Sequence, residues 1–272
     1  RPAIVSISPF LKDNTMKLST RDNRKRAVLG SVLGALVIFS ASWASAAVAP
    51  PLPGMSVQIG SESFQVENTL WSYDAIKDTF SLTGPFMATA IDGSTFTIDS
   101  AEAIPDPLLF FAGSATNNTN APLSYSIAFN SPLLPNLLGP VDSHAELGLS
   151  LTDGLNDGAT VQPTLPGGKM LNSFDLYSNG TPISKNVNIG DLFSIVSGTG
   201  TTTFSADSSL VCGQACVTMS AIMSFTLTGQ DAVGFSGKVV QVAPVPLPGA
   251  VLLFGSGLLG LAGALRKKLH LA

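Results

Sequence analysis

A strict alternation of apolar and hydroxyl side chains runs from Val217 to Thr228 (VTMSAIMSFTLT). All six odd-numbered positions are apolar, and five of the six even-numbered positions are serine or threonine. Successive side chains of a β-strand point to opposite faces of the sheet, so a period of two predicts a long strand with one buried face.

Shorter stretches repeat this pattern. Alternation occurs over residues 95–99 (TFTID) and 124–130, where Tyr125, Ile127 and Phe129 would share a face. The pair Asp92-Gly93 separates residues 87–91 from 94–98, and an Asp-Gly pair between two apolar runs predicts a β-hairpin. No stretch between the two ends of the chain has the pattern of a capped amphipathic helix.

Clusters of Gly, Pro, Asn and Asp separate the predicted strands. This punctuation favours an all-β fold, an antiparallel β-sandwich of jelly-roll or immunoglobulin-like type, over residues 47–243. A segment of this length can form one domain or a pair of lobes. Residues 132–140 (PLLPNLLGP) are the best candidate for an internal linker.

The charge of this middle segment excludes some partners. It holds four cationic residues, Lys77, Lys169, Lys185 and Lys238, against sixteen acidic ones, a formal charge of −12. A surface of that sign repels nucleic-acid phosphates and anionic lipid, so we expect no nucleic-acid partner. Cations and neutral sugars remain compatible with it.

The N-terminal region has the three parts of a secretory signal peptide. A basic stretch after Met16 precedes an uncharged apolar run over residues 27–39, and Ala44-Ser45-Ala46 provides the small residues of a cleavage site. Thirteen residues make a helix of about 20 Å, too short for a permanent anchor across a hydrocarbon core of about 30 Å. We predict a signal peptide over residues 16–46, export by the Sec machinery and cleavage by signal peptidase after Ala46. Residues 1–15 are interpreted as a non-native upstream extension.

The C-terminal region, residues 244–272, also has three parts. Prolines at 244, 246 and 248 make a stiff spacer, residues 250–265 are uncharged, and a basic stop of Arg266, Lys267 and Lys268 follows. The apolar stretch predicts a transmembrane helix, and the basic residues would stay on the cytoplasmic side. Composition alone leaves open whether this is a permanent tail anchor or a processing signal.

The amino-acid sequence of this C-terminal region resembles a known sorting signal. The string Val245-Pro246-Leu247-Pro248, then residues 253–261 (LFGSGLLGL), then the basic stop, is similar to the bacterial PEP-CTERM sorting domain in its VPLPA-type variant. The resemblance implies that an exosortase-type membrane enzyme recognises Val245 to Pro248 and removes the helix. It also implies a Gram-negative bacterium that makes exopolysaccharide. The protein would be held in the inner membrane before processing and then delivered to the cell surface or extracellular matrix.

The only two cysteines are Cys212 and Cys216. In an exported protein this spacing favours a disulfide that pins a tight loop, worth about 2 kcal/mol by the chain-entropy relation. A redox C-x-x-C motif would need two intervening residues rather than three. A zinc site would need a second pair of ligands, so we predict no metal.

Catalytic signals are weak. His144 is the one histidine of the middle segment, and no Gly-x-Ser-x-Gly motif accompanies it. Asp153 to Gly158 carries the oxygens of a calcium loop without its alternating acids, and tight-turn chemistry explains it equally. We expect no catalytic residue, no cofactor and no enzyme activity.

Three functions are compatible with these features. The first is a non-enzymatic structural or adhesive protein of an exopolysaccharide-rich envelope. The second is a carbohydrate-binding module, with Trp71 and Tyr73 as a sugar-contacting pair if exposed, although the pattern favours a buried pair of rings. The third is a secreted hydrolase that uses His144.

Overall fold

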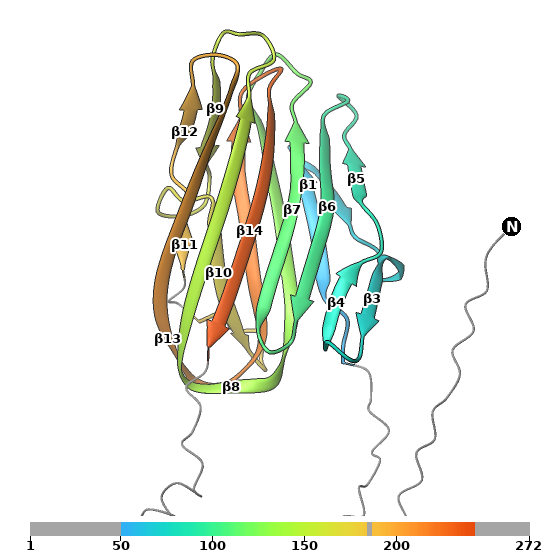
Figure 1. Cartoon of the computed structure of the whole chain (residues 1–272), viewed down its shortest axis with the longest axis vertical. Coiled ribbons are helices and arrows are strands. Elements are labelled where there is room, and N and C mark those ends of the chain that lie inside the picture. The colour runs from blue at the N-terminus through green and yellow to red at the C-terminus, as the bar shows by residue number, and fades with distance from the viewer. Residues whose placement is uncertain (1–49, 184–186, 243–272) are drawn as a thin grey trace, which may run out of the picture. The chain divides into compact units, whose positions relative to one another are not determined.

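The computed structural model describes residues 50–183 and 187–242 (Figure 1). The upstream extension, the signal peptide over 16–46 and the tail over 244–272 lie outside the described residues. Within the described ranges, no helix is long and apolar enough to cross a membrane.

Fourteen strands form one sheet in this part of the chain, and all its strand pairings are antiparallel. A single turn of 3-10 helix, η1 (Asn68–Leu70), interrupts them. The prediction of an all-β, antiparallel protein is confirmed. The strands are β1 (Gly54–Ile59), β2 (Glu62–Gln65), β3 (Trp71–Asp74), β4 (Thr79–Leu82), β5 (Phe86–Thr89), β6 (Thr95–Ile104), β7 (Leu108–Thr116), β8 (Leu123–Thr152), β9 (Ala159–Pro163), β10 (Leu171–Tyr177), β11 (Asn188–Ile189), β12 (Phe193–Ile195), β13 (Thr199–Leu227) and β14 (Ala232–Val242).

Two very long strands organise the sheet. β8 and β13 pair along almost their whole length, from Thr199 opposite Thr152 to Leu227 opposite Leu123. The first part of β8 also pairs with β1, and its last part pairs with β14. Figure 1 shows both strands curving at the lower end of the domain. β13 likewise pairs with β10 and β9 along different parts of its length. Each long strand therefore connects several shorter strands of the sheet.

The pairing of β8 with β13 is interrupted within residues 132–140. We interpreted this segment as a linker between lobes, and that interpretation is wrong, because the segment is part of the strand. Prolines lack the backbone N–H that a ladder needs. Here the ladder with β13 has no pairs from Leu133 to Asn136, so the missing N–H of Pro135 falls where pairing is already interrupted. Leu133 and Leu137 still point into the core.

The core forms between strands that are not hydrogen-bonded neighbours. The rings of Trp71 on β3 and Phe129 on β8 stack with centroids 5.6 Å apart, and those of Phe96 on β6 and Tyr125 on β8 lie 6.1 Å apart. Tyr125, Ile127 and Phe129 are all buried on one face, as the alternation predicted.

The other strand predictions are also confirmed. Residues 217–227 belong to β13, and its odd positions from Met219 to Leu227 are buried. β5 and β6 form the predicted hairpin, in which Phe86 lies opposite Ile98. Gly93 has a φ of 83°, the left-handed backbone that makes glycine favourable in such a turn.

Candidate functional site

A cluster of charged side chains that contact one another lies on β8, β13 and β14, on the face turned away from the core. Alternation along β8 turns Asp142, His144 and Glu146 outward, since Val141, Ala145 and Leu147 are buried. Strand register then supplies the partners. Asp207 on β13 lies opposite His144, and Lys238 on β14 lies opposite Glu146.

The imidazole of His144 contacts a carboxylate at each nitrogen. Nδ1 lies 2.7 Å from Oδ1 of Asp207, and Nε2 lies 3.2 Å from Oε1 of Glu146. Nζ of Lys238 lies 4.0 Å from the other oxygen of Glu146. Carboxylates accept hydrogen bonds, so both contacts are made at once only by the protonated ring. The hydrogen bonds to Asp207 and then to Glu146 raise the pKa of His144 above its ordinary 6.5.

This geometry does not activate a serine. A general base needs a free nitrogen within hydrogen-bond reach of the hydroxyl, and both nitrogens of His144 already face acids. The neighbouring Ser143 points the opposite way, into the core, where its Oγ is buried. The hydrolase hypothesis therefore receives no support from the surroundings of His144.

Two shallow depressions flank this cluster on the outward face. One, of about 420 Å³, includes the ring of Phe110 beside Glu146, Gly148, Thr203, Ser236 and Lys238. The other, of about 470 Å³, includes Asp142, His144, Asp207, Ser209 and Val240. The first depression is lined by Phe110 and Phe204 together with hydroxyl groups, one carboxylate and Lys238. The second is lined by hydroxyl groups, two carboxylates and His144. The mixture of apolar and hydroxyl groups suits a polar, uncharged ligand.

Trp71 and Tyr73 do not form an exposed sugar platform. The two rings share a face of β3, but that face points inward: Trp71 is 7% exposed and stacks on Phe129. Tyr73 packs on Phe80, and its hydroxyl donates a hydrogen bond to Asp78. The prediction of sugar contact at this pair is wrong, because the alternation identified a common face but not its direction.

The Asp153 loop is satisfied by its own backbone. The carboxylate of Asp153 accepts hydrogen bonds from the N–H groups of Leu155, Asn156 and Gly158 at 2.7–3.1 Å. Burial acts to raise the pKa of Asp153, but these donors hold it below its ordinary value. Turn chemistry accounts for the sequence here, and no cation is needed to neutralise the oxygens.

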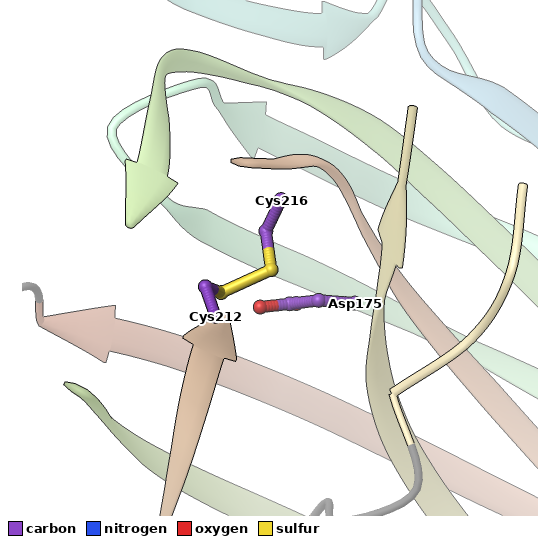
Figure 2. A group of neighbouring side chains, drawn as sticks. All are labelled: Asp175, Cys212 and Cys216. Carbon is purple, nitrogen blue, oxygen red and sulfur yellow. A yellow bond between two sulfur atoms is a disulfide. The ribbon is translucent and has the colours of Figure 1, made fainter. Parts of the chain in front are cut away.

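The structure joins Cys212 and Cys216 of β13 in a disulfide, at the point where the register of β13 against β8 shifts. Asp175 of β10 lies beside the two sulfur atoms, as Figure 2 shows. Sequence reasoning missed Asp175, because in LNSFDLY the aromatic Phe174 looks like the inward residue. In the structure Ser173 and Asp175 point inward, whereas Phe174 is half-buried.

Other predicted sites lie outside the described residues and stay predictions. They are the cleavage site at Ala44 and Ala46, the sorting motif from Val245 to Pro248, and the basic stop from Arg266 to Lys268.

Comparison with known proteins gives no family. No protein-family model matches the chain, and no curated protein does. Among solved structures, it is similar to the enzymatically active domain of bacteriophage CBA120 tailspike protein 4, with a TM-score of 0.27 and 8% identity over 61% of this chain and 20% of that one. It is also similar to the infectious bursal disease virus Gt strain structure, with a TM-score of 0.27 and 11% identity over 73% of this chain and 59% of that one. The chain thus spans less than two thirds of either structure. Similarity at this level supports no conclusion about activity.

Proposed function

We propose that this chain is an exported bacterial protein, sorted through a PEP-CTERM-like tail and delivered to a Gram-negative cell surface or extracellular matrix. The observation that carries the proposal is the order of its segments. The strands, from Gly54 to Val242, occupy the stretch between the cleavage site predicted after Ala46 and the spacer that begins at Pro244. The sheet is thus the part that would remain after both ends are removed.

We further infer that the sheet is a two-layer β-sandwich of jelly-roll or immunoglobulin-like type. The ring contacts of Trp71 with Phe129 and of Phe96 with Tyr125 support this, because they join strands that are not hydrogen-bonded to each other. Interdigitated inner faces about 10 Å apart are typical of such sandwiches.

The role of the sandwich is structural or adhesive rather than catalytic. Outward positions of the first part of β13 are mainly Thr and Ser, as at Thr201, Thr203 and Ser205, and they form a hydroxyl-rich surface. Together with the formal charge of −12 over residues 47–243, such a surface suits a hydrated exopolysaccharide-rich envelope better than an anionic membrane.

Fractionation of a Gram-negative host that contains an exosortase tests the sorting step. The wild-type chain should accumulate in the surface or matrix fraction. Replacing Pro246 and Pro248 by alanine should keep the chain in the inner membrane, whereas the matched change Pro244→Ala, just outside the motif, should not. Identical distribution of wild type and the double variant would refute recognition of this motif. Wild type found in the cytosol would refute export.

Binding of a neutral polysaccharide is the second candidate function, and the depressions beside Glu146 favour it. An aromatic ring flanked by hydroxyl and carboxylate groups can stack on a sugar and bind its hydroxyls. Affinity electrophoresis through gels that contain neutral polysaccharide should retard the protein. Phe110→Ala should reduce the retardation, and Phe86→Ala, which truncates a half-buried ring on β5, should not. Equal retardation of both variants would exclude this site.

A further inference from the structure

A cluster of polar side chains is buried inside the domain, beside the register shift of β13 against β8. Asp175 comes from β10, Cys212 and Cys216 from β13 and Gln241 from β14, and none is more than 3% exposed. A carboxylate oxygen of Asp175 and the two Sγ atoms all lie within 4.8 Å of one another. Figure 2 shows the carboxylate pointing at the disulfide.

This cluster leaves acceptors without donors. Oδ1 of Asp175 accepts a hydrogen bond of 2.8 Å from Nε2 of Gln241. The other carboxylate oxygen, Oδ2, and the amide oxygen of Gln241 have no hydrogen-bond partner. A buried, unpaired polar group destabilises a fold by about 1–3 kcal/mol, so its persistence calls for an explanation. A disulfide has no hydrogen to donate to either oxygen.

Cationic side chains do not compensate the carboxylate either. The lysines of the described ranges form ion pairs elsewhere, Lys77 with Asp74, Lys169 with Asp191 and Lys238 with Glu146. The buried site therefore offers oxygen ligands and two sulfur atoms to a cation that is not part of the chain.

We propose that Asp175, Cys212 and Cys216 form a binding site for a thiophilic divalent cation, Zn²⁺, when the disulfide is reduced, with the amide oxygen of Gln241 as a fourth ligand. Thiolate and carboxylate are both common zinc ligands, and spacings of two to four residues between cysteines are typical of zinc sites. Sequence reasoning rejected zinc because it found only one ligand pair. The missing ligands come from β10 and β14, which are distant in the sequence.

The geometry can accommodate the ion after a small movement. Tetrahedral zinc with bonds of about 2.3 Å to sulfur places two thiolates about 3.8 Å apart, so the two sulfur atoms must move apart once the bond between them is broken. The segment between the cysteines faces solvent, so a shift there displaces no packed core residue: Gly213 and Gln214 are exposed.

Reduction of the disulfide to two thiols requires two electrons, which a reductant of the phosphine or dithiol class supplies. A phosphine transfers two electrons to the disulfide and takes the oxygen of one water molecule, while the two hydrogens of that water protonate the sulfurs. The products are two thiols and a phosphine oxide. Zn²⁺ then displaces both thiol protons, because metals bind cysteine as thiolate.

Cobalt spectroscopy of the full chain tests the site. The chain has two cysteines, so a thiolate-to-Co²⁺ charge-transfer band can arise only from this pair. After reduction with a phosphine, titration with Co²⁺ should give this band, with intense visible bands typical of tetrahedral coordination and a stoichiometry of one ion per chain. Zn²⁺ should displace the cobalt. Oxidised protein should give no such bands.

Variants separate the ligands from the surroundings. Cys212→Ser with Cys216→Ser should abolish the bands. Asp175→Asn should weaken Co²⁺ binding at least tenfold. The matched change Asp207→Asn, at an exposed carboxylate on β13, the strand of the two cysteines, should leave it unchanged.

Far-UV circular dichroism of each reduced protein shows whether it keeps its sheet. Equal affinity of Asp175→Asn and wild type would overturn the proposal, as would a folded, reduced wild type without the charge-transfer band. A reduced chain that unfolds and is not refolded by Zn²⁺ would also overturn it.

Discussion

At the scale of single residues, buried polar groups tie the loops to the sheet. Asn117, at 0% exposure, donates from Nδ2 to the carbonyl oxygens of Ala121, Leu227 and Thr228. Its Oδ1 accepts from the backbone and side chain of Thr119. One amide thus connects the loop after β7 to the end of β13, a link that no apolar residue could make.

Replacing Asn117 by alanine should lower the free energy of unfolding by about 3 kcal/mol, because it leaves several buried backbone groups unpaired. Urea denaturation of both proteins measures the difference. Asn179→Ala is the matched control, since this exposed amide accepts one hydrogen bond from Thr181 in a surface turn, and its loss should change stability by less than about 0.5 kcal/mol. Similar effects of the two substitutions would contradict the role assigned to Asn117.

The buried carboxyl of Asp175 should make stability depend on pH while the disulfide is intact. Burial raises its pKa from 3.8 to about 6, although the hydrogen bond from Gln241 acts in the opposite direction. The unfolded chain therefore ionises at lower pH than the folded one. Stability should fall between about pH 4 and pH 6 and then level off, by about 3 kcal/mol in total if the full shift applies.

Asp175→Asn should remove that dependence and keep the acceptor for Gln241. We expect this variant to be more stable than wild type at pH 7.5 and equally stable at pH 3.5, in urea melts under oxidising conditions. A variant less stable than wild type at pH 7.5 would show that the ionised carboxylate is favoured in the fold.

His144 should titrate above its ordinary pKa of 6.5, because hydrogen bonds to Asp207 and Glu146 favour the charged ring. The stabilisation from these contacts is complete below pH 6.5 and is lost as pH rises through the raised pKa. NMR titration of the ring protons should show this, and Asp207→Asn should lower the value. Asp99→Asn, on an exposed position of β6, should not; a pKa unchanged by Asp207→Asn would mean that the contact is absent in solution.

At the scale of elements, the period of two in the sequence was a sound guide to strands and their shared faces. The stretch after Val217 and the Tyr125 face were identifiable because their alternation is local. The length of β8 was not, because Pro132, Pro135 and Pro140 are the usual marks of a strand end. Only pairing with β13, remote in sequence, shows that the strand continues through them.

The sequence also does not reveal which face of a strand points toward the core. Trp71 and Tyr73 share a face by alternation, but whether that face meets the core depends on Phe129, more than fifty residues away. The cluster of Asp175 with Cys212 and Cys216 was unpredictable for the same reason, since its members meet only through strand order.

The close approach of β6 and β7 at Gly113 provides a test of the register. A Cβ atom at Gly113 would overlap the carbonyl oxygen of Thr97, next to the register shift between Ile98 and Ser100. Gly113→Ala should therefore lower the free energy of unfolding by about 3 kcal/mol, since backbone must move to accept the methyl group. Gly54→Ala, where no atom lies within 4 Å, is the control and should be nearly neutral in the same denaturation experiment. Tolerance of alanine at Gly113 would argue against this pairing.

At the scale of the whole molecule, we propose that a folded sheet lies between two ends that direct its transport. The described strands start eight residues after the cleavage site predicted at Ala46 and stop two residues before Pro244. Both ends combine an apolar stretch with several basic residues. The sheet between them has few basic residues.

The intact mass of the mature protein, purified from the surface or matrix of the producing bacterium, tests this division most directly. We predict a mature chain that begins at Ala47 and lacks the apolar tail with its basic stop, so that peptides from Leu258 to Arg266 are absent. A secreted product that retains Leu258 to Arg266 would contradict processing of the tail, and one that retains residues 27–39 would contradict cleavage of the signal peptide.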